Sequence, residues 1–265
     1  MKKLLIVLLL TSSLFAHDEV EEQIELVSRQ IAADPENAML YVQRGELHRL
    51  HEDWPAAHAD LDRAAKLDPS LTIVHYARGM VELESGRPAA AKVLLDRFLE
   101  LQPRHSQAHL ARARALVRLS QPEAAVADYY AAIANMQPPT PDLYHERAKL
   151  LASLGRVDEA IGSLDAARST LGTVTSLQRL AIDLELAAGR YDGALARVNA
   201  LAARAQRKEA FLALKGDILA KAGRLEEAKA TYRETLALIA ALPDPHRHSA
   251  AVRQLTERLA TALEK

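Results

Sequence analysis

The sequence predicts an all-α fold: an α-α superhelix, or solenoid, of about six helical hairpins with a capping helix at each end. The first observation is a period of about 34 residues. In windows counted from Ala38, position 20 of the window (slot 20) is always alanine: Ala57, Ala91, Ala125, Ala160, Ala194 and Ala228. Slot 8 is small in every window but the fifth: Gly45, Gly79, Ala113, Ala148, Ile182 and Gly216.

Two further observations agree with this fold. Signals that end helices repeat with the same period, as prolines at Pro35, Pro69 and Pro103 and as Gly-Arg pairs that begin at Gly86, Gly155, Gly189 and Gly223. Apolar residues make up 49% of the chain but aromatic residues only 4%. That composition suits helices packed through alanine and leucine better than it suits strands.

The first 16 residues have the pattern of a secretory signal peptide. Lys2 and Lys3 precede an apolar run over Leu4–Leu10 that is too short to span a bilayer. We expect cleavage after Ala16, which would leave His17 as the mature N-terminus. The chain contains no cysteine, so we expect neither lipidation at the junction nor disulfides. The pattern favours a periplasmic or secreted protein without stable membrane insertion after cleavage.

The remaining chain divides into a capping helix, the repeats and a second cap. We place the caps at residues 17–37 and 243–265, and the repeats over 38–242 as windows 38–71, 72–105, 106–140, 141–174, 175–208 and 209–242. The formal net charge of -1 becomes -3 without Lys2 and Lys3. A near-neutral chain lacks the basic surface that a nucleic-acid-binding protein needs, so we expect no nucleic-acid partner.

Each window is expected to form two helices joined by a tight turn. In the first window, Asp34-Pro35 predicts the start of a helix that runs roughly to Leu50, and Pro55 suits the first turn of the second helix. The small residues at slots 8 and 20 predict a close crossing of the two helices. A larger side chain at Ala57 would be overpacked, at a cost of about 1–3 kcal/mol.

The aromatic positions add a family resemblance. Tyrosine or tryptophan occupies slots 4, 17 and 24 in several windows, at Tyr41, Tyr144, Trp54, Tyr191, Tyr129 and Tyr232, and alanine occupies slot 27 at Ala64, Ala132 and Ala167. This pattern resembles the tetratricopeptide repeat over roughly residues 38–242. The resemblance implies a scaffold that binds proteins or peptides, because stacks of this family rarely carry an active site of their own.

Two departures from the repeat stand out. Ile182 occupies the small slot of the fifth window, after Gly172-Thr173-Val174 in place of a proline, which predicts a splayed or register-shifted hairpin. An extra residue enters through the proline-rich stretch 137–141, where we expect a kink in the superhelix.

Arginine recurs at slot 7, and aspartate recurs on the facing second helix. The arginines are Arg44, Arg78, Arg112 and Arg147. We expect Arg44–Asp60 and Arg112–Asp128 to be ion pairs inside a hairpin, in preference to a ladder of arginines that binds acidic partners.

The resemblance also implies where a partner binds. In this family the concave groove is lined by slots 2, 5, 9, 12 and 13 of the first helices. Carried over by position, the candidate partner-binding residues are Met39, Val42, Ile73, Tyr76, Met80, Leu110, Arg114, Arg118, His145 and Lys149. An apolar first half that grades into a basic stretch would suit a peptide with apolar anchors and an acidic end. The alternative, weighed equally, is that some of these side chains contact the next repeat.

Catalytic and metal-binding signatures are weak. Val42 and Glu46 stand where the chaperone-binding members of the family carry Lys and Asn, so that carboxylate clamp is not predicted. The sequence has no HExxH, GxSxG or P-loop motif, and we predict no catalytic residues, no metal site and no cofactor. The histidine pairs His48/His51, His105/His109 and His246/His248 do not supply the three or four ligands of a closed zinc site.

The function predicted from the sequence is therefore an exported, non-catalytic scaffold that holds a protein or peptide partner in its concave groove. One alternative is a periplasmic metal-handling protein that uses His17 and the His246/His248 loop. Another is a structural component of an envelope assembly that binds through its convex face or its caps.

Overall fold

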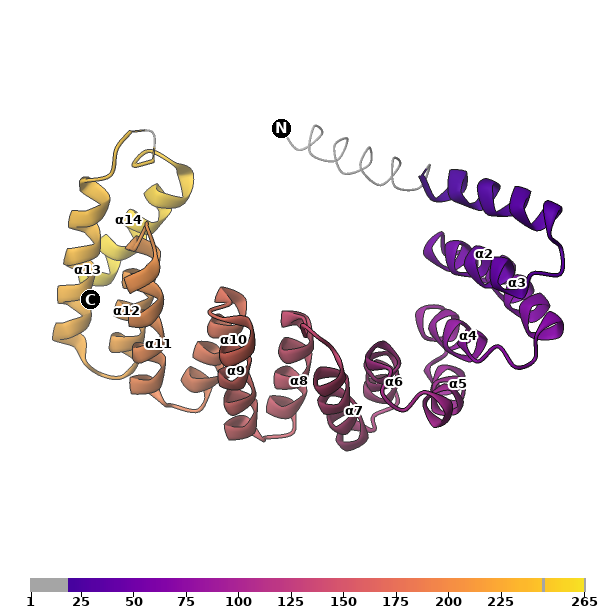
Figure 1. The fold of residues 1–265 in the computed structure, drawn as a ribbon. Helices are drawn as coiled ribbons and strands as arrows, with labels where there is room; N and C mark the ends of the chain where they lie inside the picture. Colours follow the sequence, from indigo (N-terminus) through magenta and orange to yellow (C-terminus); the bar gives the residue numbers. More distant parts are fainter. Residues whose placement is uncertain (1–18, 245, 265) are drawn as a thin grey trace. The chain divides into compact units, whose positions relative to one another are not determined.

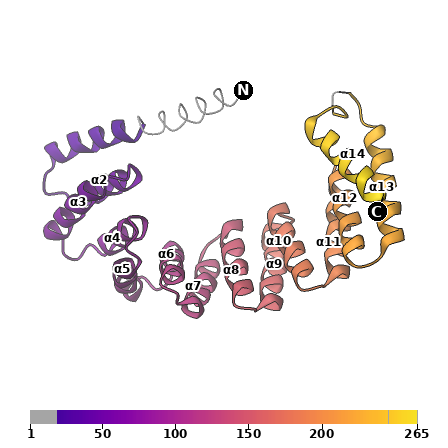
Figure 2. The same ribbon diagram turned by 180° about the vertical axis from the view of Figure 1, so that it is seen from behind.

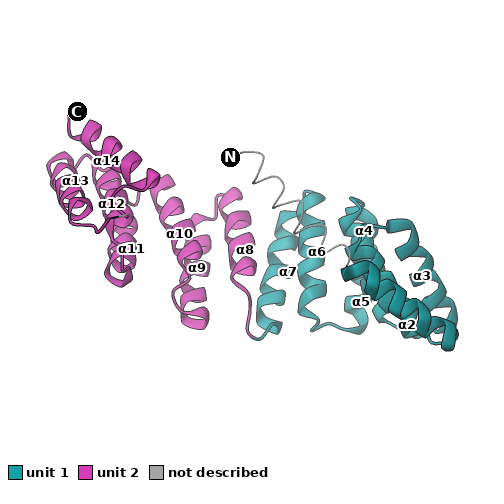
Figure 3. Ribbon diagram, turned by 90° about the horizontal axis from the view of Figure 1, so that it is seen from above, with its two compact units in different colours: residues 1–137 teal, residues 138–265 magenta. Residues whose placement is uncertain are grey.

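The computed structural model describes residues 19–244 and 246–264, and every regular element among them is a helix (Figure 1). The all-α solenoid predicted from the period is confirmed. The predicted signal peptide and His17 lie outside the described residues. The chain forms two compact units, residues 1–137 and 138–265, which are coloured separately in Figure 3. The boundary between them falls inside the proline-rich stretch that the sequence marks as irregular.

Unit 1 contains a helix over residues 19–33 and three hairpins. The hairpins are α2 (Ala38–Leu50) with α3 (Trp54–Leu67), α4 (Ile73–Glu84) with α5 (Pro88–Leu101), and α6 (Ser106–Arg118) with α7 (Pro122–Asn135). Within this unit the first helices α2, α4 and α6 line the inner side of a curved stack, and α3, α5 and α7 lie on its outer side (Figures 1 and 2).

Unit 2 contains three more hairpins and a final helix. They are α8 (Pro141–Ser153) with α9 (Val157–Leu171), α10 (Thr175–Ala187) with α11 (Tyr191–Arg204), α12 (Glu209–Lys221) with α13 (Leu225–Ala240), and α14 (Ala250–Leu263). Val252 and Leu259 of α14 are buried in one hydrophobic cluster with Ile218, Leu219 and Tyr232 of the last hairpin. The last helix therefore covers the end of the stack, as predicted for a cap.

The start of the first hairpin differs from the prediction. The helix begins at Ala38, and the Asn37 side chain caps it by accepting a hydrogen bond from the Met39 amide at 3.2 Å. Asp34 instead belongs to the end of the preceding helix, because its amide donates to the carbonyl oxygen of Gln30 at 2.9 Å. The Asp34-Pro35 signal therefore marks the turn between two helices.

The small residues of the repeat lie where the two helices of a hairpin touch. Ala57, Ala91, Ala125, Ala160 and Ala194 are all 0% exposed. A Cβ atom on Gly45 would lie 3.0 Å from the Cγ atom of Leu61, and one on Gly79 would lie 2.8 Å from the Cγ atom of Leu95. Close packing, and not turn formation, therefore explains the small slots inside the helices.

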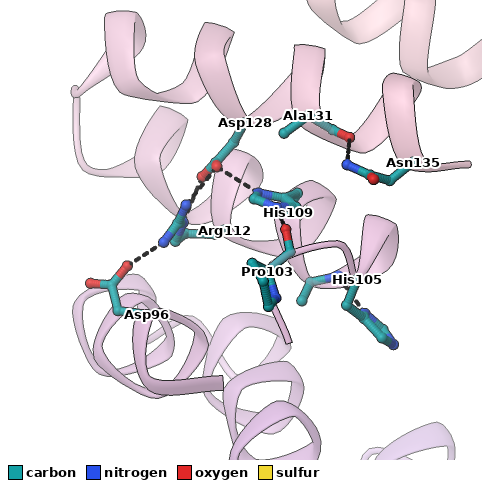
Figure 4. A network of polar contacts seen from close by, with 9 residues as sticks. Asp96, Pro103, His105, His109, Arg112, Asp128, Ala131 and Asn135 are labelled. Carbon is teal, nitrogen blue, oxygen red and sulfur yellow. Dashed lines mark hydrogen bonds and ion pairs between the residues drawn. The ribbon is translucent and has the colours of Figure 1, made fainter. Parts of the chain in front are cut away.

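Two of the slot-7 arginines, Arg44 and Arg112, form the hairpin ion pairs that the sequence predicts. Arg44 donates two hydrogen bonds to Asp60, at 2.7 and 2.6 Å, and a third to Ser28 of the preceding helix at 3.1 Å. Arg112 holds Asp128 through two bonds of 2.7 Å and also reaches Asp96 of the previous hairpin at 2.8 Å (Figure 4). The same side chain thus closes one hairpin and joins it to its neighbour.

The fifth hairpin keeps the register of the others. Its helices span slots 1–13 and 17–30, as α2 and α3 do, and Ile182 is fully buried at slot 8. In this hairpin slot 7 is Ala181, and the arginine that joins neighbouring helices stands on the second helix instead. Arg197 of α11 donates to Asp165 of the previous hairpin and to Glu185 of α10. A register shift, one of the two outcomes expected from Ile182, is therefore wrong.

Among the described residues, no helix combines the length and the apolar character that a membrane span requires.

Candidate functional site on the inner face of unit 1

Eight of the ten candidate groove residues lie on the first helices of unit 1, and their exposure differs. Met39 of α2 is 44% exposed, and Arg114 and Arg118 of α6 are also exposed. Ile73, Tyr76 and Met80 of α4 are half-buried. Val42 and Leu110 are buried, at 4% and 8% exposure. These two side chains stabilise the stack, as the alternative interpretation of the groove positions expects for part of the set.

The other two candidates belong to unit 2. His145 is half-buried and Lys149 is exposed, and both lie on α8.

Tyr76 is the best-fixed aromatic side chain of the inner face. Its ring centroid lies 5.4 Å from that of Phe98 on α5 and 5.0 Å from that of His105, which precedes α6. His105 meets Phe98 edge-on at 5.0 Å. Two elements, α5 and the turn before α6, thus hold the ring that α4 carries, and aromatic pairs at these separations are favourable beyond their buried area. The half-buried ring leaves part of its surface for a ligand.

Charged side chains surround Tyr76. Arg49 of α2 donates to Glu46 on the same helix at 3.0 Å and to Glu84 at the end of α4 at 2.6 Å, so it joins two hairpins. Burial raises the pKa of the Tyr76 hydroxyl, and the carboxylates of Glu46 and Glu84 raise it further. The guanidinium groups of Arg49 and Arg114 act on the same hydroxyl in the opposite direction. We call Glu46, Arg49, Tyr76, Glu84 and Arg114 the inner-face cluster.

Glu46 is the most constrained carboxylate of this cluster. Burial raises its pKa, against the opposing effect of Arg49. Its Oε1 atom is buried and makes no hydrogen bond with the described residues. The Glu46 side chain as a whole is 31% exposed, so its carboxylate lies at the edge of the inner face.

Arg118 combines exposure with a structural contact. It donates to the carbonyl oxygen of Leu83 near the end of α4. The basic side of the inner face therefore consists of Arg114 and Arg118, and Arg118 also caps the C-terminal end of α4.

The histidines singled out in the sequence have structural contacts. His105 caps α6 by accepting the amide hydrogen of Ala108 at 3.1 Å. The ring of His109 lies between Asp128 and the carbonyl oxygen of Pro103, at 2.9 Å from each (Figure 4). One ring nitrogen of His109 therefore faces a carboxylate and the other faces a backbone carbonyl oxygen.

In the remaining pairs, three histidines contact acids. His48 lies 3.8 Å from Asp60, His51 lies 3.3 Å from Glu21, and His248 lies 3.1 Å from Asp244. Within residues 19–244 and 246–264, no three His, Asp or Glu side chains are grouped to hold a metal ion.

Chemically, the inner face offers an aromatic surface, adaptable methionine side chains, carboxylate acceptors and arginine donors. These groups recognise a polypeptide through apolar anchors and hydrogen bonds. Sequence position alone finds Tyr76 and Arg114. Glu84 also stands at a groove slot, slot 13 of its window. Slot position does not find Phe98, which meets Tyr76 because the two helices of their hairpin pack together.

Comparisons with known proteins agree with this architecture. Solved structures with the same fold include YrrB, a TPR protein with an unusual peptide-binding site. It is 21% identical, the match covers 66% of this chain and 90% of YrrB, and the TM-score is 0.54. PilW, a widely conserved type IV pilus biogenesis factor, is 18% identical over 77% of this chain and 95% of its own, with a TM-score of 0.59. PilF of Pseudomonas aeruginosa is 15% identical over 83% and 97%, with a TM-score of 0.55.

At these identities the structures show a shared fold and not a shared partner. The search of curated proteins finds no match. The family model of the tetratricopeptide repeat matches residues 76–142 and 179–244, which together make up half of the chain. The chain therefore belongs to the tetratricopeptide repeat family.

Proposed function

We propose that the protein is an exported, non-catalytic scaffold that binds a peptide or protein partner on the inner face of unit 1. The observation that carries the proposal is the inner-face cluster around Tyr76. It places a held aromatic ring, two arginines and two carboxylates on adjacent first helices.

Apolar anchoring is the first part of the argument. Tyr76 and Met80 lie one helical turn apart on α4, and Met80 packs beside the cluster that contains Phe98 and Leu95. Met39 on α2 adds an exposed thioether. Methionine adapts its shape to a partner, and a fixed tyrosine provides contact area at a small entropic cost. An apolar side chain of the partner would lie against Tyr76 and Met80.

Polar recognition is the second part. The carboxylates of Glu46 and Glu84, on side chains that are 31% and 35% exposed, can accept a backbone or side-chain N–H group of the partner. Arg114 adds positive charge on the α6 side of Tyr76. A peptide with an apolar anchor and an acidic residue next to it would match both parts, because charge-assisted hydrogen bonds to guanidinium are among the strongest that proteins form.

Two further points support the proposal. YrrB, which shares the fold, has a peptide-binding site. The signal-like residues 1–16 are the basis for export, and sequencing of the N-terminus of the protein from cells should then begin at His17. An N-terminus at Met1 would refute the export part of the proposal and leave the binding part unaffected.

Affinity capture from a cell-envelope extract tests the binding site. One bait is the unsubstituted protein, and a second carries Tyr76→Ala, Met80→Ala and Arg114→Ala. A matched control carries Tyr130→Ala, Val93→Ala and Arg97→Ala, which change exposed residues of α5 and α7 on the outer side of the same unit. Circular dichroism checks that all three baits stay helical.

We expect a partner that the unsubstituted and control baits retain and the inner-face variant loses. Truncation of central aromatic and arginine residues in an interface typically costs 2 kcal/mol or more, or roughly a thirtyfold loss in affinity. If the inner-face variant retains the same partners as the unsubstituted bait, the inner face is not the binding site. A partner lost only by the outer-face variant would favour the structural envelope component, which binds through its convex side.

A further inference from the structure

The structure assigns a second binding site to the protein, within unit 2: we propose that a pocket between α9, α10 and α11 binds a carboxylate group. The pocket has a volume of about 340 Å³. Its lining includes Arg168, Thr173, Gln178, Arg197, Leu201 and Arg204. Ligand pockets typically have volumes of about 300–1,000 Å³, so this one suits a small acid or the end of a peptide.

Three arginines meet at this pocket, and they differ in their partners. Arg197 is largely buried, with a side chain that is 13% exposed, and it is neutralised locally. It donates to both carboxylate oxygens of Asp165, at 2.7 and 2.8 Å, and to Glu185 at 3.1 Å. It also donates to the side-chain oxygen of Gln178 at 3.1 Å, which fixes that amide at the wall of the pocket.

The other two arginines have no acid partner among the described residues. Arg204 donates to the hydroxyl oxygen of Thr173, a neutral group. Arg168 lies near enough to Asp165 to contribute to the lowered pKa of that carboxyl, after the larger effect of Arg197, but it forms no ion pair with it. Both guanidinium groups therefore keep donors for a ligand.

The charges at the pocket favour a single negative charge on the ligand. Three arginines line the pocket, and two carboxylates, those of Asp165 and Glu185, contact one of them, so one positive charge is in excess. A carboxylate balances this excess, whereas a doubly charged phosphate would leave net negative charge. The planar guanidinium fork also matches the geometry of a carboxylate.

The departure from the repeat at residues 172–174 coincides with an unusual backbone conformation beside the pocket. Gly172 has a φ of +73°, and Gly172-Thr173-Val174 replaces the proline that precedes other windows. The helix α10 that follows has no side-chain cap, so amide groups of its first turn lie next to the pocket loop without an intrahelical partner. Positive charge at a helix N-terminus adds to the attraction for an anion.

A purely structural role for the two arginines makes a different prediction. Arg168 and Arg204 stand in the last turns of α9 and α11, where a positive charge stabilises a helix. If that were their whole role, their replacement would lower stability and leave ligand binding unchanged. Binding and stability must therefore be measured on the same variants.

The experiment uses the full chain and simple probes. Acetate, glutarate and the dipeptide Ala-Ala are added to the ¹⁵N-labelled protein, together with Ala-Ala amide and inorganic phosphate as comparisons. Shifts of the Gly172, Thr173 and Thr175 amide resonances report binding at this pocket and yield the dissociation constants. The variants are Arg168→Ala, Arg204→Ala, Arg204→Lys and, as a control, Arg179→Ala. Arg179 is an exposed arginine of α10 whose nearest acid is Asp183 at 3.8 Å.

We expect the free acids to move these resonances and the amide to leave them in place. Each alanine variant at Arg168 or Arg204 should bind about tenfold to a hundredfold more weakly, the range for a lost charge-assisted hydrogen bond. Arg204→Lys should recover part of the loss, and Arg179→Ala should bind as the unsubstituted protein does. Tighter binding of Ala-Ala than of acetate or glutarate would identify a peptide C-terminus as the source of the carboxylate.

Three outcomes would overturn the proposal. The first is no shift with any free acid at about 10 mM, a concentration at which even millimolar binding saturates. The second is equal binding by the unsubstituted protein and the arginine variants. The third is tighter binding of phosphate than of every carboxylate. None of these results bears on the inner face of unit 1, so this proposal and the proposed function can fail separately.

Discussion

Replacement of Gly216 by alanine tests whether close helix packing is the reason for the small slot of the repeat. Gly216 lies inside α12, opposite Tyr232 of α13. An added Cβ atom would lie 2.3 Å from the Cε1 atom and 2.6 Å from the Cδ1 atom of the Tyr232 ring. Favourable carbon contacts need about 3.5–4.0 Å, so either the ring or the helix must move.

The ring has little freedom to move. Tyr232 is 5% exposed, and its hydroxyl donates to Asp217 at 2.9 Å. Asp217 is in turn held by Arg258 of α14 at 2.7 Å. Overpacking of this kind costs about 1–3 kcal/mol, and alanine regains about 0.8–1.0 kcal/mol of helix propensity. Because the contact is so short, we expect a net loss of about 1–2 kcal/mol in the free energy of unfolding.

Gly162 provides the matched control. It lies inside α9 on the surface of the same unit, and an added Cβ atom would meet nothing within 4 Å. Gly162→Ala should therefore stabilise the protein by about 0.5–1 kcal/mol through helix propensity alone. Urea unfolding followed by circular dichroism measures both changes. If Gly216→Ala stabilises the protein as much as Gly162→Ala does, the close-packing explanation is refuted.

Two further predictions follow from the polar contacts. Asp128→Ala should lower the free energy of unfolding by about 3 kcal/mol, because Arg112 and His109 both lose this buried acceptor. Asp62→Ala removes a 60% exposed partner of Arg78 and should lower it by at most about 1 kcal/mol. Equal losses in urea unfolding would contradict the difference in burial. Burial, and then Asp217, raise the pKa of Tyr232 to about 12 from an ordinary value of 10.0, so the folded state keeps a proton that the unfolded chain loses. The stability that Tyr232 contributes is full below about pH 10 and is lost as the pH rises to about 12, by roughly 2–3 kcal/mol in total. The difference in unfolding free energy between the protein and its Tyr232→Phe variant should shrink over that range, and a constant difference would show an ordinary pKa.

Local signals in the sequence predicted most of the turns but not all of them. Gly86, Gly155, Gly189 and Gly223 have φ values between 72° and 83°, as a Gly-Arg turn suggests. Glu52 and Ser120 take the same left-handed conformation at the same slot, with φ values of 60° and 57°. The stacking of the hairpins imposes this turn even where the residue does not favour it, at a cost of about 1–2 kcal/mol.

Comparison of equivalent slots could not predict every polar contact. The ion pairs of Arg44 and Arg112 follow from their slots, because both partners recur in the same window. Arg197 makes the corresponding contact from slot 23 on the second helix of its hairpin, a slot at which no other window has an arginine. Repeats need a charge balance between neighbouring helices, and either helix can supply the cation.

The sequence by itself determined the fold class, the number of hairpins and the small slots, because each hairpin packs only against its neighbours and therefore leaves a periodic pattern. Only the tertiary structure decided which groove positions are accessible. Val42 and Tyr76 occupy the same slot in adjacent windows, yet Val42 is buried and Tyr76 is half-exposed. The pocket of Arg168, Arg197 and Arg204 depends on three helices that meet in space, and no spacing along one window encodes that meeting. A period records contacts that every repeat shares, whereas a binding site uses contacts that differ between repeats.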